Sequence, residues 1–150
     1  MFLLFSQLTF GQNPYYYSID RTNGLPSNSV YDIFQDSKGF MWFATGKGLC
    51  RYDGSVFKTF TSDTQTSKSG SCINEDSFGR IWYCNFDGYL YYVENGELKN
   101  LPQKESVGYM KYGIIKDKLF LMQSKSVAVY DLKTLQLVYS YPVLNENTRA

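Results

Sequence analysis

The sequence repeats itself at a spacing of 40 residues, and this repeat limits the possible folds more than any other feature. Eight of the 24 positions from 29 to 52 carry the same residue 40 positions later, where chance would give about one or two. A weaker third copy lies at an offset of 78, where Phe120 corresponds to Trp42 and Tyr130-Asp131 to Tyr52-Asp53. This period is typical of helical repeats or of four-stranded propeller blades. The identical pairs are Ser29/Ser69, Ile33/Ile73, Asp36/Asp76, Ser37/Ser77, Gly39/Gly79, Trp42/Trp82, Gly48/Gly88 and Tyr52/Tyr92.

The residues between the turns favour strands over helices. They are rich in β-branched and aromatic side chains, and Asp53-Gly54 is a strong hairpin signal. Because no amphipathic helix of about ten residues fits between the glycines, each copy is expected to be an antiparallel meander of four short strands. The expected strands are 30–35, 40–45, 49–52 and 55–60, then 73–74, 81–84, 89–93 and 97–101, then 110–115, 119–123, 127–130 and 137–141.

The predicted fold class is therefore all-β: a β-propeller fragment of about three four-stranded antiparallel blades, at about 24–60, 69–101 and 107–141. Stacked blades bury both faces of each sheet, which suits the aromatic run from Phe40 to Phe43. Closure of a ring usually takes about four to eight blades. Residues 13–150 are thus expected to be an incomplete propeller, an open arc from a longer protein whose remaining blades are its partners.

Residues 1–12 are expected to be a partial signal peptide, with cleavage near Gly11 or Gln12. The segment is apolar and uncharged, is too short to span a membrane, and lacks the usual basic start. The alternative is an apolar first strand. The run Tyr15–Tyr17 that follows is expected to form an edge strand that helps to close the ring of the full protein, with a ligand-binding face as the alternative.

Composition removes several classes of function. Fifteen Lys and Arg against 14 Asp and Glu leave a net charge of +1, so nucleic-acid binding has no electrostatic support. The chain has no histidine, which excludes Ser-His-Asp and Cys-His catalysis and histidine-ligated zinc within these residues. We therefore expect no cofactor, no metal and no catalytic residue in this chain.

The repeated residues are expected to be structural. Trp42 and Trp82 are each suited to stack on a sugar ring, but their repetition favours blade core. Asp36 and Asp76 are expected to cap their own turns in neighbouring blades rather than to form a carboxylate pair. The glycines supply turn conformations and match no phosphate loop. The structural repeat motif comprises Asp36, Gly39, Trp42, Gly48, Tyr52, Gly54, Asp76, Gly79, Trp82, Gly88 and Tyr92.

Arg51 is the candidate ligand-binding residue, because it lies in a strand within an otherwise aromatic blade. It can face the hydroxyls or a carboxylate of a ligand, but a salt bridge between blades or stacking on an aromatic ring is favoured.

The three cysteines, Cys50, Cys72 and Cys84, have no CxxC spacing and no histidine partner, so zinc is not expected. A disulfide between Cys72 and Cys84 across the turn at 76–79 is conceivable. Buried free thiols are favoured, because bridges between adjacent strands are strained.

Residues 24–54 resemble the two-component regulator propeller repeat. The matching motifs are Gly24-Leu-Pro26, Gln35-Asp36, Met41-Trp-Phe-Ala-Thr45 and Gly48-Leu-Cys-Arg-Tyr-Asp-Gly54. The resemblance covers about 19–131 and is strongest in its first 40 residues. The second copy has Tyr-Tyr-Val at 91–93 in place of Arg-Tyr-Asp, and the third keeps only Tyr130-Asp131.

The resemblance implies an exported sensor region of a bacterial two-component receptor, on the periplasmic side of the inner membrane. A downstream membrane helix and a histidine kinase or transcriptional output would lie elsewhere in the parent. The implied partners are an oligosaccharide or other small-molecule ligand and a second copy of the receptor. The family keeps an arginine at the position of Arg51 in many blades, which favours a structural role for it. The alternatives are a secreted carbohydrate-active enzyme of propeller class, such as a lyase, and a secreted protein-binding scaffold.

Overall fold

The computed structural model describes residues 15–103, 106, 112–123 and 125–143, and in them the chain forms twelve strands in three four-stranded antiparallel sheets. The predicted all-β class and the three blades are confirmed. Residues 1–12, expected to be a signal peptide, and 107–111, expected to open blade 3, lie outside the described residues. The elements are η1 (Arg21–Asn23), β1 (Val30–Gln35), β2 (Met41–Thr45), β3 (Gly48–Tyr52), β4 (Phe57–Phe60), β5 (Gly70–Glu75), β6 (Ile81–Asn85), β7 (Leu90–Glu94), β8 (Glu97–Asn100), β9 (Tyr112–Ile115), β10 (Lys118–Met122), β11 (Ser126–Asp131) and β12 (Leu137–Pro142).

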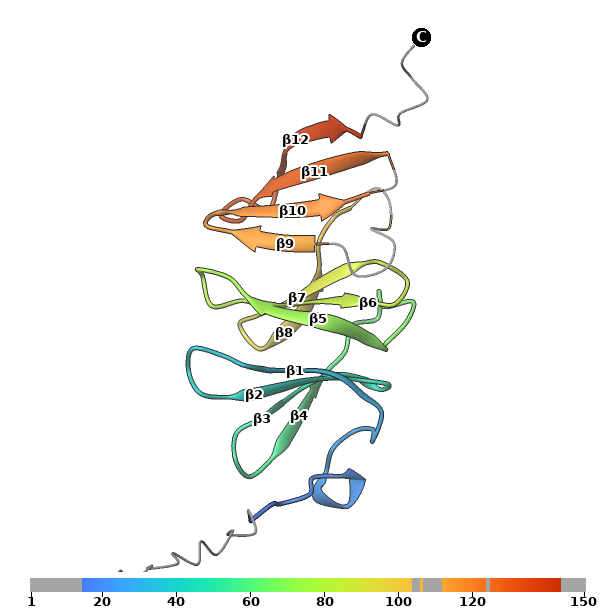
Figure 1. The fold of residues 1–150 in the computed structure, drawn as a ribbon, viewed down its shortest axis with the longest axis vertical. Coiled ribbons are helices and arrows are strands. Elements are labelled where there is room, and N and C mark those ends of the chain that lie inside the picture. The colour runs from blue at the N-terminus through green and yellow to red at the C-terminus, as the bar shows by residue number, and fades with distance from the viewer. Residues whose placement is uncertain (1–14, 104–105, 107–111, 124, 144–150) are drawn as a thin grey trace, which may run out of the picture.

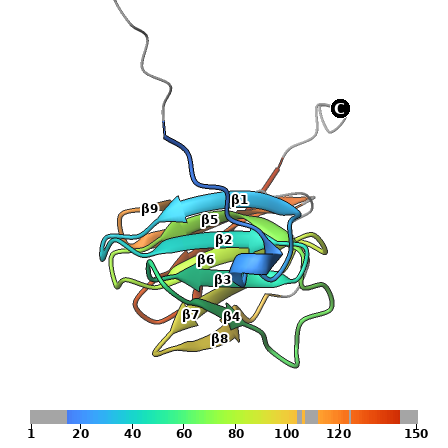
Figure 2. The same cartoon turned by 90° about the horizontal axis from the view of Figure 1, so that it is seen from below.

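The three sheets stack one on the next as an open arc (Figure 1). Each sheet is a meander in which consecutive strands pair, so β1–β4 form blade 1, β5–β8 blade 2 and β9–β12 blade 3. Figure 2 shows the first strands of the blades along one side of the stack and β4 and β8 along the opposite side. Because consecutive strands are antiparallel, the turns of each blade alternate between two faces of the arc, and equivalent turns of the three blades lie on the same face.

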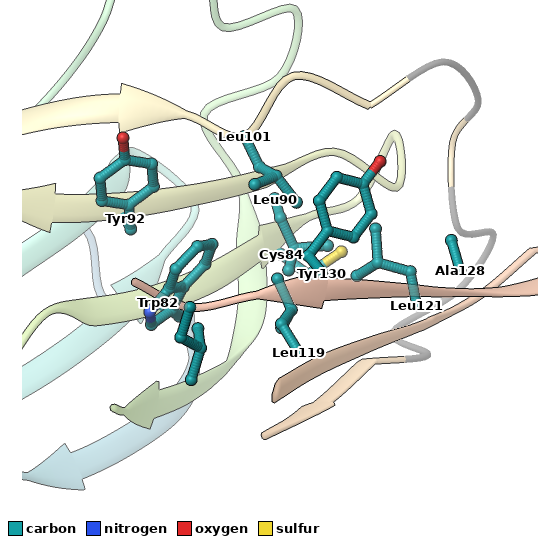
Figure 3. Packing of buried hydrophobic residues seen from close by; sticks show 10 residues of the cluster. Trp82, Cys84, Leu90, Tyr92, Leu101, Leu119, Leu121, Ala128 and Tyr130 are labelled. Carbon is teal, nitrogen blue, oxygen red and sulfur yellow. The ribbon is translucent and has the colours of Figure 1, made fainter. Parts of the chain in front are cut away.

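Each pair of neighbouring blades encloses its own hydrophobic core. Along β6 the side chains alternate, so that Ile81 and Tyr83 face blade 1 while Trp82 and Cys84 face blade 3. All five β6 residues are therefore buried. The core between blades 1 and 2 contains Trp42, Ala44, Leu49, Phe60, Ile73, Ile81, Tyr83, Tyr91, Val93 and Leu98. The core between blades 2 and 3, shown in Figure 3, contains Trp82, Cys84, Leu90, Tyr92, Leu101, Leu119, Leu121, Ala128, Tyr130 and Leu132.

The other face of blade 1 is covered by the segment that precedes it. Leu25 is buried there against Phe43 and Cys50, and Ile19 packs against the same cluster. The turn η1 holds this segment in place, because the carboxylate of Asp20 accepts a hydrogen bond from the backbone N–H of Thr22 at 2.7 Å.

Not every sheet face is buried. Burial of both faces, expected for every blade, holds at β6, where all five residues are buried, but not at β12, where all six are exposed. Tyr15–Tyr17, expected to form an edge strand, belong to no strand of the described residues, and Tyr15 is 94% exposed.

The 40-residue offset does not hold through the whole blade. Thr45 pairs with Gly48 across two residues, Gly46 and Lys47, whereas the backbone N–H of Asn85 donates to the carbonyl of Tyr89 across three residues, 86–88. The extra residue shifts the register by one, so Tyr52 lies opposite Met41 while Tyr92 lies opposite Trp82. The expected equivalence of Tyr52 with Tyr92, and of Gly48 with Gly88, is therefore wrong. Gly48 is the first residue of β3, and Gly88 lies in the loop.

All three cysteines are free. The strand residue opposite Cys84 is Ser71, and a bulge follows in β5, where Cys72 has a left-handed backbone with φ of 57°. Cys50 and Cys84 are buried as expected, but Cys72 is only half-buried, because the bulge turns it out of the ladder. None of the helices in the described part of the chain is both long and apolar enough to cross a membrane.

Candidate functional site

The turn between the first two strands of blades 1 and 2 is built around one carboxylate. In blade 1, Asp36 accepts hydrogen bonds from the backbone N–H groups of Lys38 and Phe40 at 3.0 and 2.9 Å. Its second oxygen accepts the indole N–H of Trp42 at 2.7 Å. Asp76 does the same for its own turn and for the indole of Trp82, also at 2.7 Å. The repeated aspartate thus caps a turn and satisfies the polar atom of the repeated core tryptophan.

The two blades differ in how they surround this carboxylate. The position after the turn glycine is Phe40 in blade 1 and Arg80 in blade 2. The residue opposite the tryptophan is Arg51 in blade 1 and Tyr92 in blade 2. Both blades therefore pair a guanidinium with an aromatic ring, but the two residue types have exchanged places between the turn and the third strand of the blade. The guanidinium carbon of Arg51 lies 4.2 Å from the centre of the Phe40 ring, and that of Arg80 lies 5.6 Å from the Tyr92 ring.

This exchange leaves Arg80 paired and Arg51 unpaired. The Nε of Arg80 donates to Asp76 at 2.7 Å, and its Nη2 donates to the backbone carbonyl of Leu132 in blade 3. Arg51 approaches from β3, across from Trp42. Its buried Nε has no hydrogen-bond partner among the described residues.

A cavity of about 380 Å³ lies beside Arg51, between blades 1 and 2. We call it the blade 1–2 pocket. Blade 1 contributes the turn after β1 and parts of β3 and β4, and blade 2 contributes the turn after β5 and the hairpin between β7 and β8. The lining residues are Asp36, Lys38, Phe40, Trp42, Arg51, Lys58, Phe60, Phe78, Gly79, Arg80, Ile81, Val93, Glu94, Asn95 and Gly96.

The charges of the pocket are unbalanced. Four of its lining residues are cationic and two are anionic. Glu94 is already engaged, because the ammonium of Lys99 lies 2.9 Å and the guanidinium of Arg80 lies 3.8 Å from its carboxylate. The hydrogen bond to Glu94 raises the pKa of Lys99. Lys38, Arg51 and Lys58 belong to no ion pair of the described residues.

The pocket gathers four of the residues that the sequence singled out, Asp36, Trp42, Gly79 and Arg51. The other motif residues lie elsewhere in turns, strands or the second core. Lys38, Lys58 and Glu94 were missed, because they are not repeated and only the stacking of two blades brings them together.

Groups with large pKa shifts lie outside this pocket. Burial raises the pKa of the Cys50 thiol to about 12. The backbone N–H groups of Val56 and Ser55 donate to the Asp53 carboxylate and lower its pKa to about 2. Within the described residues no group of three or more His, Cys, Asp or Glu is placed to hold a metal ion. The arrangement is suited to binding an anion rather than to acid–base chemistry.

Comparison with known proteins shows that residues 24–47 match the two component regulator propeller family. Histidine kinase P4 of Formosa agariphila is 35% identical over 68 residues, which is 45% of this chain and 5% of that protein. This chain thus spans a small part of the curated relative it matches.

Solved structures share the fold. The extracellular domain assigned to the hybrid two component system BT4673 of B. thetaiotaomicron superposes with a TM-score of 0.67 at 18% identity, over 95% of this chain and 20% of that one. The corresponding domain of BT3049 from the same organism gives 0.61 at 20% identity, over 88% and 20%. Virginiamycin B lyase of Staphylococcus aureus gives 0.60 at 13% identity, over 82% and 44%. The match to the two component regulator propeller family, which the sequence resemblance predicted, therefore falls at residues 24–47, in the first blade of a three-bladed open arc of β-propeller fold.

Proposed function

We propose that this chain is part of the exported, ligand-sensing propeller of a two-component receptor and is itself non-catalytic. The observation that carries the proposal is the family match at residues 24–47, which falls on blade 1 of a propeller arc. The similarity to histidine kinase P4 and the fold shared with extracellular domains of two component systems support it.

In this proposal residues 1–12 direct export, and the remaining blades, a membrane helix and a kinase or transcriptional output lie in the rest of the parent protein. The ligand is an oligosaccharide or another small molecule. Its binding shifts the packing of blades, or of two receptor copies, and that shift biases the membrane helix.

A lyase activity has less support. The structural likeness to virginiamycin B lyase is at 13% identity and concerns the fold. A variant of that lyase in which a histidine is replaced by alanine is described as catalytically inactive, and this chain has no histidine. Four of the six charged residues that line the blade 1–2 pocket are lysines or arginines, whereas an acid–base site requires groups that titrate near neutral pH.

The test is a comparison of the native host with a strain that lacks the gene. Both strains are grown on a panel of single oligosaccharides, and their transcripts are quantified. We expect one saccharide to induce a set of genes in the native host and not in the deletion strain, with complementation restoring the induction. Protease treatment of spheroplasts should cleave the chain without cell lysis. Identical transcript profiles on every saccharide, or protection from protease until lysis, would contradict the proposal.

A further inference from the structure

We propose that the blade 1–2 pocket binds an oxyanion group, a carboxylate, phosphate or sulfate, of a small soluble ligand, held by Arg51, Lys38 and Lys58. This inference goes beyond the proposed function, because it assigns a site and a ligand chemistry from the geometry of two blades, whatever the rest of the protein does.

The unpartnered nitrogen of Arg51 is the first argument. A buried N–H group without an acceptor is costly, and native structures rarely leave one so. The guanidinium carbon lies over the Phe40 ring, 4.2 Å from its centre, and this contact helps to hold the group in place. The Nε itself is enclosed by protein atoms, but Arg51 lines the pocket, so an oxyanion there would compensate the charge of its guanidinium in the charge-assisted pairing that this group favours.

The surrounding charge is the second argument. The anionic side chains of the pocket are already committed: Asp36 accepts three hydrogen bonds from its own blade, and Glu94 is paired with Lys99 and Arg80. Lys38 and Lys58 add two exposed ammonium groups on the blade 1 side. The ammonium of Lys58 lies 5.1 Å from the centre of the Phe60 ring and has no carboxylate partner in the described part of the chain. With four cationic and two anionic lining residues, the pocket carries a net positive charge.

The contact between blades 2 and 3, which we call the second seam, can be compared with the contact between blades 1 and 2, the first seam. At the second seam the guanidinium of Arg80 reaches across to the carbonyl of Leu132, so blades 2 and 3 provide the acceptor from within the chain. At the first seam no described acceptor from blade 2 reaches Arg51, and a cavity remains. The same architecture thus satisfies its arginine in one place and leaves it unsatisfied next to open space in the other.

The size and lining of the pocket indicate an anionic group on a compact organic body. A volume of about 380 Å³ is at the lower end of small-molecule sites. Phe78, which is 53% exposed, offers an apolar surface beside the cations. A single sugar ring that carries a carboxylate has these properties.

The test is calorimetric titration of the intact protein with glucuronate, with glucose as the neutral analogue, and with inorganic phosphate. We expect glucuronate or phosphate to bind, glucose not to bind, and the affinity to fall as NaCl increases. Lys58→Gln and Arg51→Gln should each weaken binding about tenfold or more. Lys47→Gln is the matched control, because Lys47 is an exposed lysine at the opposite end of β2 and its loss changes the net charge equally.

Two results would overturn the inference: no binding of any anionic probe, or equal weakening by Lys47→Gln and Lys58→Gln, which would indicate non-specific attraction. If Arg51→Gln fails to fold, as judged by circular dichroism, the exposed variants Lys38→Gln and Lys58→Gln still decide the matter. A negative titration with an intact transcriptional response would place the sensory ligand elsewhere, so the two proposals fail separately.

Discussion

Replacing Asp76 with alanine should destabilise the protein by about 3–5 kcal/mol, the usual cost of removing one partner of a buried ion pair. The Asp76 side chain is fully buried, and its Oδ2 accepts both the Nε of Arg80 and the indole N–H of Trp82 at 2.7 Å. Without it, the buried guanidinium of Arg80 keeps only the Leu132 carbonyl and a partly exposed Glu94 at 3.8 Å. The cost is large against a typical domain stability of about 5–15 kcal/mol.

Blade 1 supplies the control for this substitution. Asp36 makes the same turn and indole hydrogen bonds, but no arginine depends on it. Asp36→Ala should therefore cost about 1–3 kcal/mol, the penalty for buried donors that lose their acceptor. The difference between the two losses of stability, about 2 kcal/mol, is the cost of leaving the buried charge of Arg80 without its carboxylate partner.

The assay is urea unfolding followed by tryptophan fluorescence, since Trp42 and Trp82 are the only tryptophans and each reports on one seam. Asp76→Asn, which keeps the shape of the side chain, serves if the alanine variant does not fold. Adding Arg80→Met to Asp76→Ala removes the unpaired charge and should restore part of the stability. Equal losses for Asp36→Ala and Asp76→Ala, or no recovery in the double variant, would refute the reasoning.

Three further predictions concern the backbone, the thiols and acid stability. Gly70→Ala should destabilise the fold in urea unfolding by several times the effect of Gly113→Ala. An added Cβ at Gly70 would lie 2.4 Å from the Cys84 carbonyl oxygen, whereas at Gly113 it would meet no atom of the described residues within 4 Å. Similar losses for the two variants would contradict this prediction. Cys50, whose pKa burial raises to about 12, should react with a thiol reagent at pH 8 far more slowly in the native protein than in urea, where all three free cysteines should react; a missing thiol in urea would indicate a disulfide. The pKa of Asp53 is lowered to about 2 in the folded state, so its stabilisation is complete above the ordinary value of 3.8 and is lost as the pH falls through 2; a carboxyl titration by NMR with a midpoint near 3.8 would disprove it.

The sequence predicted the blades well where local signals and stacking agree. Apolar and aromatic runs bounded by turns gave β1 its observed bounds, Val30–Gln35, and the start of β12 at Leu137. The predicted strand boundaries were wrong where a side-chain hydrogen bond or a bulge changes the backbone within an apolar run. The fourth strand begins at Phe57 rather than at 55, because the Asp53 carboxylate holds the N–H groups of Ser55 and Val56 in the turn. The fifth begins at Gly70, since the bulge at Cys72 breaks the alternation that marks a strand.

The candidate site was less predictable than the fold. A search for repeats finds the residues that stabilise each blade separately, such as the aspartate–tryptophan pair. Lys38 and Lys58 occur once and come from separate turns and strands, so only the stacked blades reveal that they face the same space as Arg51. The physical reason is that packing between blades is non-local, whereas the repeat is a local pattern.

Blade 1 has an aromatic ring in the turn and an arginine in its third strand, and blade 2 has the reverse. This exchange restricts the order in which the two residues could have been replaced if the blades arose from one repeat. From the Phe40–Arg51 arrangement, two replacements lead to the Arg80–Tyr92 arrangement. If the ring is replaced first, two guanidinium groups share the single carboxylate of the turn, so one of the two like charges in this largely buried region has no anionic partner. If the arginine is replaced first, two aromatic rings face each other, which proteins tolerate readily. The route without that repulsion passes through a blade with an aromatic ring at both positions, an arrangement that an Arg51→Tyr variant would reproduce.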